Sequence, residues 1–251
     1  MSIRGIFFDL YGTLLVYGDM QAAWSDWLSA FYACFQKHGL SISRDEFSRC
    51  CDRFFDKEEP PQHQDGLTVF ERRIKALGIE LGTEMAPEQT SIIANTTADA
   101  WQKYVTLDRE ALPVLKSLNA HKILGLITNF DHPPYVYKIL SKYGLNSLFQ
   151  KIIISAEVGF KKPDPIIFSI ALEGTSLQSN EIIYIGDTEE DVRGAMAANA
   201  KPILIQREKT WTDNSALDYT IVDTKSSSLS NIIMQNKVSV ITKLSELIAM
   251  F

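Results

Sequence analysis

The chain has 251 residues, of which 45% are hydrophobic, and a formal net charge of −6 from 25 basic and 31 acidic residues. This length accommodates one large α/β domain, or a core with a smaller inserted domain. The acidic balance and the lack of any run rich in lysine and arginine argue against a nucleic-acid partner. The sequence has no apolar stretch of about 18 residues, so we expect no membrane span.

The cysteines and the N-terminal segment indicate the cellular compartment. The chain has three cysteines, Cys34, Cys50 and Cys51. An odd number with two adjacent members argues against a disulfide framework, and none has zinc-site spacing. Free thiols are typical of a reducing compartment, and the first residues lack the pattern of a signal peptide. We therefore expect a cytoplasmic protein.

An apolar run near the start of the chain leads directly into a carboxylate. Ile6 to Phe8 has the pattern of a buried parallel strand, and Asp9 follows it. In open α/β sheets, ligands bind at the carboxyl ends of the strands, and Gly12 permits a sharp turn there. Asp9 is thus a candidate nucleophile or metal ligand, and the alternative is an Asp that caps the following turn.

The next part of the chain, from Met20 to about Trp101, shows helical periodicity and no strand pattern. Ser43 begins a helix with a capping box, and Pro87 opens the last helix of the region. Aromatic and aliphatic residues three to four apart predict one apolar helix face, which we expect to be core: Trp24, Trp27, Leu28, Phe31 and Phe35. The pattern predicts an all-helical insert, residues 17–105, between two parts of a core, 1–16 and 106–251.

From Leu107 onward, apolar strands alternate with helices, a pattern that predicts a parallel sheet with right-handed crossovers. The predicted tail comprises a short edge strand (219–222), a polar break (226–230) and an amphipathic helix (241–251). The predicted strands are 123–127, 149–154, 182–185 and 202–205, and the predicted helices are 113–118, 135–143, 166–172 and 191–198. The fold class is therefore α/β, a Rossmann-like parallel-sheet core with an inserted α-helical cap domain.

Polar residues follow four of these segments at one edge of the predicted sheet. They are Asp9, Thr128-Asn129, Lys162 in the loop 159–165, and Asp187. A single such residue usually caps a helix or turn, but four at one edge are difficult to explain by capping. The edge is therefore the predicted active site.

These residues match four motifs in order, and the sequence resembles the haloacid dehalogenase superfamily along its whole length. Asp9 to Thr13 resembles the family's Asp-x-Asp-x-Thr motif with one departure, at Tyr11. Thr128 and Lys162 match the second and third motifs. Gly186, Asp187 and Asp191 match the fourth, and the helical insert resembles the cap of subfamily I.

The resemblance implies a Mg²⁺-dependent phosphatase that acts on a small phosphorylated metabolite. Asp9 is then the nucleophile that forms an aspartyl-phosphate, and Mg²⁺ offsets the repulsion between the two anions. The implied metal site comprises the side chains of Asp9 and Asp187 and the backbone carbonyl of Tyr11, with support from Asp191. Lys162, Thr128 and Asn129 are the implied ligands of the phosphoryl oxygens.

Tyr11 is the departure that leaves alternatives open. Phosphatases of the family usually have an Asp there as acid and base, whereas a tyrosine, with a reference pKa near 10, is a poor base at neutral pH. Loss of such a group typically costs about 10²- to 10⁴-fold in rate.

Tyr11 thus favours a metal-independent L-2-haloacid dehalogenase, or a catalytically impaired binding protein. Against the dehalogenase, the fourth motif resembles a metal site, and position 40, where such enzymes carry a halide-binding arginine, is Leu40.

Substrate choice in capped members of the family lies in the cap, here between Val16 and Tyr104. Trp24, Tyr32 and Arg53 are the candidates. We expect the cap to move about the linkers 16–18 and 104–108 in order to exclude water. No pattern in the sequence specifies an oligomeric state.

Overall fold

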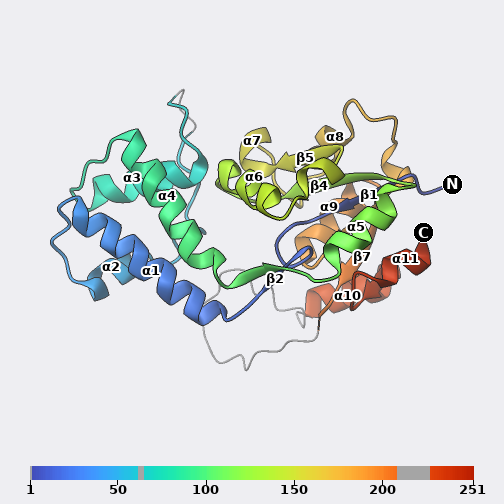
Figure 1. The fold of residues 1–251 in the computed structure, drawn as a ribbon, viewed down its shortest axis with the longest axis horizontal. Helices are drawn as coiled ribbons and strands as arrows, with labels where there is room; N and C mark the ends of the chain where they lie inside the picture. Colours follow the sequence, from blue (N-terminus) through green and yellow to red (C-terminus); the bar gives the residue numbers. More distant parts are fainter. Residues whose placement is uncertain (1, 62–64, 208–226) are drawn as a thin grey trace.

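A six-stranded, wholly parallel sheet forms the centre of the computed structural model, which describes residues 2–61, 65–207 and 227–251 (Figure 1). The spatial order is β5-β4-β1-β6-β7-β8. The strands are β1 Gly5–Phe8, β4 Ile123–Thr128, β5 Lys151–Ile154, β6 Ile182–Gly186, β7 Lys201–Ile205 and β8 Ser239–Ile241. The predicted α/β fold class is confirmed.

Helices cover both faces of the sheet because successive strand residues point to opposite sides. Ile6 and Phe8 are buried in one hydrophobic cluster with α5, α6 and α11, whereas Phe7 is buried in another with α8 and α9. The helices of this part of the chain are α5 Ala111–Asn119, α6 Pro133–Lys142, α7 Ser155–Val158, α8 Ile166–Leu172, α9 Glu189–Ala197, α10 Ser227–Asn236 and α11 Glu246–Met250, with 3₁₀ turns at Asn146–Leu148 and Ser179–Glu181.

The register of the sheet brings the predicted site residues together. Phe8, the last residue of β1, pairs with Leu126 of β4 and Ile185 of β6. The residues just beyond β1, β4 and β6 therefore meet at one edge. The chain order changes direction at β1, since β4 lies on one side and β6 on the other, and ligands bind at such points in open α/β sheets.

A group of helices lies beside the sheet (Figure 1), and we refer to it as the helical unit: α1 Met20–Lys37, α2 Arg44–Cys50, α3 Val69–Glu80 and α4 Pro87–Gln102. The predicted apolar face is largely core, with Trp27, Leu28, Phe31 and Phe35 buried and Trp24 partly buried against them. The helix at Ser43 has the predicted capping box but ends at Cys50, and residues 51–57 form turns.

A short antiparallel pair of strands, β2 Leu15–Tyr17 and β3 Val105–Leu107, joins the helical unit to the sheet. The sequence analysis did not predict these strands, because three residues are too few to show alternation. Both chain crossings between the two parts therefore run through one hydrogen-bonded ribbon.

The C-terminal prediction was partly wrong. Within the described residues, positions 227–230 of the predicted polar break lie in α10, where Leu229 is buried against Val192 and Leu204. Ile241 ends β8 instead of starting a helix, because the segment pairs with β7 and extends the sheet. The predicted edge strand 219–222 lies outside the described residues.

Two further findings concern the described part of the chain. Its cysteines, Cys34, Cys50 and Cys51, are free thiols, as predicted. Among the helices described, we find none with the length and apolar character that a membrane crossing requires.

Gly125→Ala is expected to destabilise the fold, because an added Cβ would lie 2.8 Å from ring atoms of Phe7 on the neighbouring strand. Overpacking of this kind costs about 1–3 kcal/mol. The measurement is urea unfolding of Gly125→Ala, Phe7→Leu and the double variant. Because the smaller leucine relieves the clash, the double variant should lose less stability than the sum of the single variants. Additive losses would contradict this explanation.

Candidate active site

The predicted site residues converge at the carboxyl edge of the sheet. Asp9 follows β1, Thr128 ends β4, Asp187 follows β6, and Lys162 lies in the loop between α7 and α8. Asp9, Thr128 and Lys162 are at most 5% exposed. Side chains with so little access to water need partners inside the protein.

The ammonium of Lys162 is the centre of the site. It lies 2.6 Å from Asp9 Oδ1 and 2.7 Å from Asp191 Oδ1, and it donates to the Tyr184 hydroxyl at 2.9 Å. Burial lowers the pKa of Lys162, but the charges of Asp191 and Asp9 outweigh burial and hold that pKa above its usual value. The two neighbouring carboxylates thus favour the protonated form of Lys162.

Tyr184 is a site residue that the sequence analysis did not identify. Its hydroxyl donates to the carbonyl of Ile127 at 2.8 Å and accepts from Lys162. The available signal was a phenol in the otherwise aliphatic strand β6, since a buried tyrosine hydroxyl usually finds a partner.

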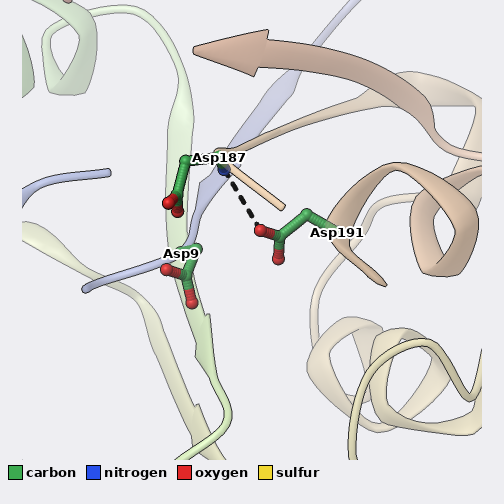
Figure 2. A group of neighbouring side chains, drawn as sticks. All are labelled: Asp9, Asp187 and Asp191. Atoms are coloured by element: carbon green, nitrogen blue, oxygen red, sulfur yellow. Dashed lines mark hydrogen bonds between the residues drawn. The ribbon is translucent and has the colours of Figure 1, made fainter. Parts of the chain in front are cut away.

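Three carboxylates, those of Asp9, Asp187 and Asp191, lie close together at this edge of the sheet (Figure 2), and two of them, Asp9 and Asp191, contact Lys162. Each offers one oxygen, and these oxygens lie within 4.8 Å of one another. Burial, with repulsion from Asp191, raises the pKa of Asp9 to about 6 against the effect of Lys162. Burial and the negative charges of Asp191 and Asp9 raise the pKa of Asp187 well above its usual range. With all three ionised, the cluster has an excess of negative charge.

Asp191 is saturated with hydrogen bonds. Its Oδ2 accepts from the backbone N–H groups of Asp187 (3.1 Å, drawn in Figure 2) and Thr188 (3.0 Å) and from Thr188 Oγ1 (2.7 Å). Its Oδ1 accepts from Lys162. Thr188 and Asp191 form the capping box of α9, so the first turn of this helix fixes the carboxylate.

The loop after Asp9 packs directly against Asp187. Gly12 has a positive φ of 86°, and a Cβ there would lie 2.1 Å from an Asp187 oxygen. Thr13 Oγ1 donates to Asp187 Oδ1 at 3.2 Å. Glycine is thus required for both the turn and the close approach.

The Asn129 amide is bound to the backbone of the Lys162 loop. Its Oδ1 accepts from Lys162 N–H at 2.9 Å, and its Nδ2 donates to the Lys162 carbonyl at 3.0 Å. Nδ2 also lies 3.4 Å from Glu190 Oε2. Asn129, next to Thr128 of the second motif, therefore fixes the position of the Lys162 loop, which carries the third motif.

The Tyr11 side chain extends toward the helical unit. Its hydroxyl donates to Gln102 Oε1 at 3.1 Å, and Gln102 Nε2 donates to the carbonyl of Val105. The ring stacks on Phe130 at 5.0 Å and tilts against Trp101 at 5.4 Å. Burial raises the pKa of the Tyr11 phenol above its usual value, which makes proton transfer by this group less favourable still.

The residues named as specificity candidates contact neighbours within the segment 24–56. Trp24 stacks on Trp27, the Tyr32 hydroxyl donates to the carbonyl of Ile42, and the exposed Arg53 contacts Asp56.

Other residues of the helical unit reach the loop after β4. Arg73 contacts Asp131 at 2.9 Å, and Thr68 Oγ1 lies 3.0 Å from His132 Nδ1. Helical periodicity alone did not identify these contacts. It predicts which residues share one face of a helix, but not which loop that face meets.

Comparison with known proteins gives a family and several relatives. A family model described as haloacid dehalogenase-like hydrolase matches residues 3–199. The chain is 35% identical over 155 residues to a glyceraldehyde 3-phosphate phosphatase of Methanopyrus kandleri, a match that covers 61% of this chain and 63% of the relative. It is 27% identical to a phosphoglycolate phosphatase of Yersinia pestis, over 52% of this chain and 56% of the relative. The chain thus spans less than two thirds of the length of these relatives.

A solved structure extends the likeness over the whole fold. The HAD-hydrolase YfnB of Bacillus subtilis, bound to magnesium, aligns with a TM-score of 0.56 at 20% identity and covers 100% of this chain and 99% of its own. At this identity the likeness concerns the fold.

Lys162→Met is expected to destabilise the protein by about 3–5 kcal/mol in EDTA at pH 8, because it leaves two buried carboxylates without their cation. The loss should shrink at pH 5, where Asp9, whose pKa is already raised, takes up a proton. Urea unfolding at both pH values measures this difference.

The matched control is Lys138→Met. Lys138 pairs with Asp99 at 2.7 Å, but both side chains are about half exposed (49% and 54%). Its loss should cost less than about 1 kcal/mol at either pH. If both variants lost the same free energy of unfolding, the explanation that the Lys162 charge compensates buried carboxylates would be wrong.

Proposed function

The chain belongs to the haloacid dehalogenase-like hydrolases, and we propose that it hydrolyses a phosphate monoester of a small metabolite with the help of Mg²⁺. The observation that carries the proposal is the group of three carboxylates, Asp9, Asp187 and Asp191, two of which, Asp9 and Asp191, contact the ammonium of Lys162. The phosphatase names of the relatives support the same reaction.

The donor set fits a magnesium ion. Mg²⁺ prefers oxygen ligands, and the cluster has an excess of negative charge that a divalent cation would neutralise. We propose that the side chains of Asp9 and Asp187 and the backbone carbonyl of Tyr11 hold the ion, while Asp191 orients the site through its hydrogen bonds. When bound, the ion would supply charge neutralisation for the phosphoryl group.

Asp9 is the proposed nucleophile. Lys162 keeps Asp9 ionised and placed, and the same cation attracts the phosphoryl oxygens. Attack by an Asp9 oxygen on phosphorus breaks the bond between phosphorus and the ester oxygen and gives an aspartyl-phosphate, and the departing alkoxide takes a proton from water to become the alcohol. Water then attacks the aspartyl-phosphate, which releases inorganic phosphate and restores the Asp9 carboxylate. Thr128 and Asn129 are proposed to face the phosphoryl group from the end of β4, with Asn129 also holding the Lys162 loop.

We propose that residues 17–105 form a cap domain over a core of residues 1–16 and 106–251. The contact of Arg73 with Asp131 supports this, since Asp131 lies three residues beyond Thr128. A cap seated on this loop excludes water from the site. The cap is then the source of substrate specificity, and the phosphatase relatives suggest small phosphorylated acids and sugars.

A metal-independent L-2-haloacid dehalogenase is the second candidate, favoured by Tyr11, and a binding protein is the third. A dehalogenase has no use for a divalent cation, whereas the three clustered carboxylates are costly without one. Halide release from 2-chloropropionate in EDTA would favour the second candidate. A specific protein partner, with no turnover of any substrate, would favour the third.

Asp9→Asn should abolish hydrolysis of a phosphate-ester panel, with a loss of at least about 10³-fold, because the amide cannot attack phosphorus. EDTA should abolish the wild-type activity, and added Mg²⁺ should restore it. Phosphate release at neutral pH measures both effects. The control Asp99→Asn removes a half-exposed carboxylate and should remain active. Full activity in Asp9→Asn, or in EDTA, would contradict the proposal.

Tyr11→Phe should leave the shape of the pH–rate profile unchanged, since the buried phenol does not transfer protons in the proposed reaction. The variant keeps the stack on Phe130 and loses only the hydrogen bond to Gln102, so turnover should fall by less than about tenfold. Loss of one limb of the profile would assign an acid or base role to Tyr11 and overturn this expectation.

A further inference from the structure

The guanidinium of Arg207, two residues beyond β7, holds the backbone of the loop that follows Asp9. Its Nη1 donates to the carbonyl of Gly12, and its Nη2 donates to the carbonyl of Thr13 at 2.6 Å. Charged donors make strong hydrogen bonds, and the planar guanidinium can serve two acceptors at once.

Asp108 orients this guanidinium. Its Oδ2 accepts from Arg207 Nη2 at 2.7 Å and from Nε at 3.2 Å. The other oxygen accepts from Glu110 N–H at 2.8 Å, and the Asp108 N–H donates to the carbonyl of Leu14. The side chains of Arg207 and Asp108 are only 24% and 14% exposed, so water screens this ion pair less than a surface pair.

The loop lies between Arg207 and the carboxylate of Asp187. Arg207 binds the carbonyls of Gly12 and Thr13, while the Gly12 α-carbon and the Thr13 hydroxyl contact Asp187. The β1–β6 pairing fixes the backbones of Asp9 and Asp187, so the guanidinium, by holding the loop, affects the placement of the Asp187 side chain.

We propose that Arg207 is a positioning residue for the proposed hydrolysis: by holding the loop 10–13 it places the carboxylate of the metal ligand Asp187 relative to the nucleophile Asp9. This inference rests on the proposed function. Arg207 acts through backbone carbonyls, so its role does not depend on the side chain at position 11. Misplacement of a reacting group by about 1 Å can cost about 10²-fold in rate.

The test compares full-length Arg207→Ala and Arg207→Lys with the control Arg4→Ala. Arg4 bridges Glu181 and Ser176 at the opposite edge of the sheet, so its removal reports the general cost of losing a multidentate arginine. We expect the kcat of Arg207→Ala toward p-nitrophenyl phosphate to fall by about 10- to 100-fold with KM changed by less than about threefold. The Mg²⁺ concentration for half-maximal activity should rise, and Arg4→Ala should keep wild-type kinetics.

Arg207→Lys should recover little activity, because one ammonium cannot serve both carbonyls and Asp108 in the same geometry. Added guanidinium ion at millimolar concentration should partly restore Arg207→Ala and have no effect on Arg4→Ala. A folded Arg207→Ala with wild-type kcat and metal dependence, or an equal loss in Arg4→Ala, would overturn the proposal.

A second readout does not require turnover. In the structure, Gly12 N–H donates to the carbonyl of Leu15, and the N–H groups of Leu14 and Leu15 donate to the carbonyl of Leu10. Hydrogen exchange of these amides should accelerate in Arg207→Ala and not in Arg4→Ala, and calorimetry should show weaker Mg²⁺ binding only in the former.

These measurements separate the two proposals. If the wild-type protein hydrolyses no phosphate ester, the proposed function fails, and exchange and Mg²⁺ binding still decide the role of Arg207. Unchanged exchange and unchanged Mg²⁺ affinity in Arg207→Ala would overturn the positioning role.

Discussion

The interaction on which the site depends is the contact of one buried ammonium, that of Lys162, with the carboxylates of Asp9 and Asp191. Burying an ion costs several kcal/mol unless close partners compensate it. The surrounding structure supplies these partners: the register of β1 with β4 and β6 sets where the strands end, Tyr184 accepts from the ammonium, and the first turn of α9 fixes Asp191. A shift of any of these elements would leave a charge unpaired in a place that water does not reach.

With all three carboxylates ionised, the positive charge of Lys162 is too small to balance their negative charge. Lys162 balances one negative charge, and Asp187 remains beside Asp9 and Asp191, where, within the described part of the chain, the hydroxyl of Thr13 is its side-chain donor. The raised pKa values of Asp9 and Asp187 reflect this imbalance and the burial of both groups. A core designed only for stability would replace such a cluster with apolar residues at little cost. Its presence at the point where the strand order changes direction is an argument for function.

Much of the fold and of the candidate site could be predicted, because buried parallel strands are continuous apolar runs. A polar residue that directly follows such a run is easy to recognise in the sequence. Asp9, Thr128 and Asp187 were recognisable for this reason, whereas Lys162, in the loop between α7 and α8, was identified from the order of the motifs. Contacts between separate elements could not be predicted: the Asn129 amide on the Lys162 backbone, the Tyr11 hydroxyl on Gln102, and the two carbonyls bound by Arg207 each join residues more than 30 positions apart in the chain. Short strands such as β2 and β3 carry too few residues for a periodic signal, and β8 was masked by the helical pattern of the residues after it.

The ribbon of β2 and β3 has a mechanical consequence. The helical unit is joined to the sheet by two crossings that are hydrogen-bonded to each other, with Val16 opposite Thr106, rather than by two independent tethers. Two independent tethers would allow rotation about several axes, whereas a paired ribbon bends readily out of its plane and resists shear within it. The paired ribbon therefore restricts the directions in which the helical unit can be displaced relative to the sheet.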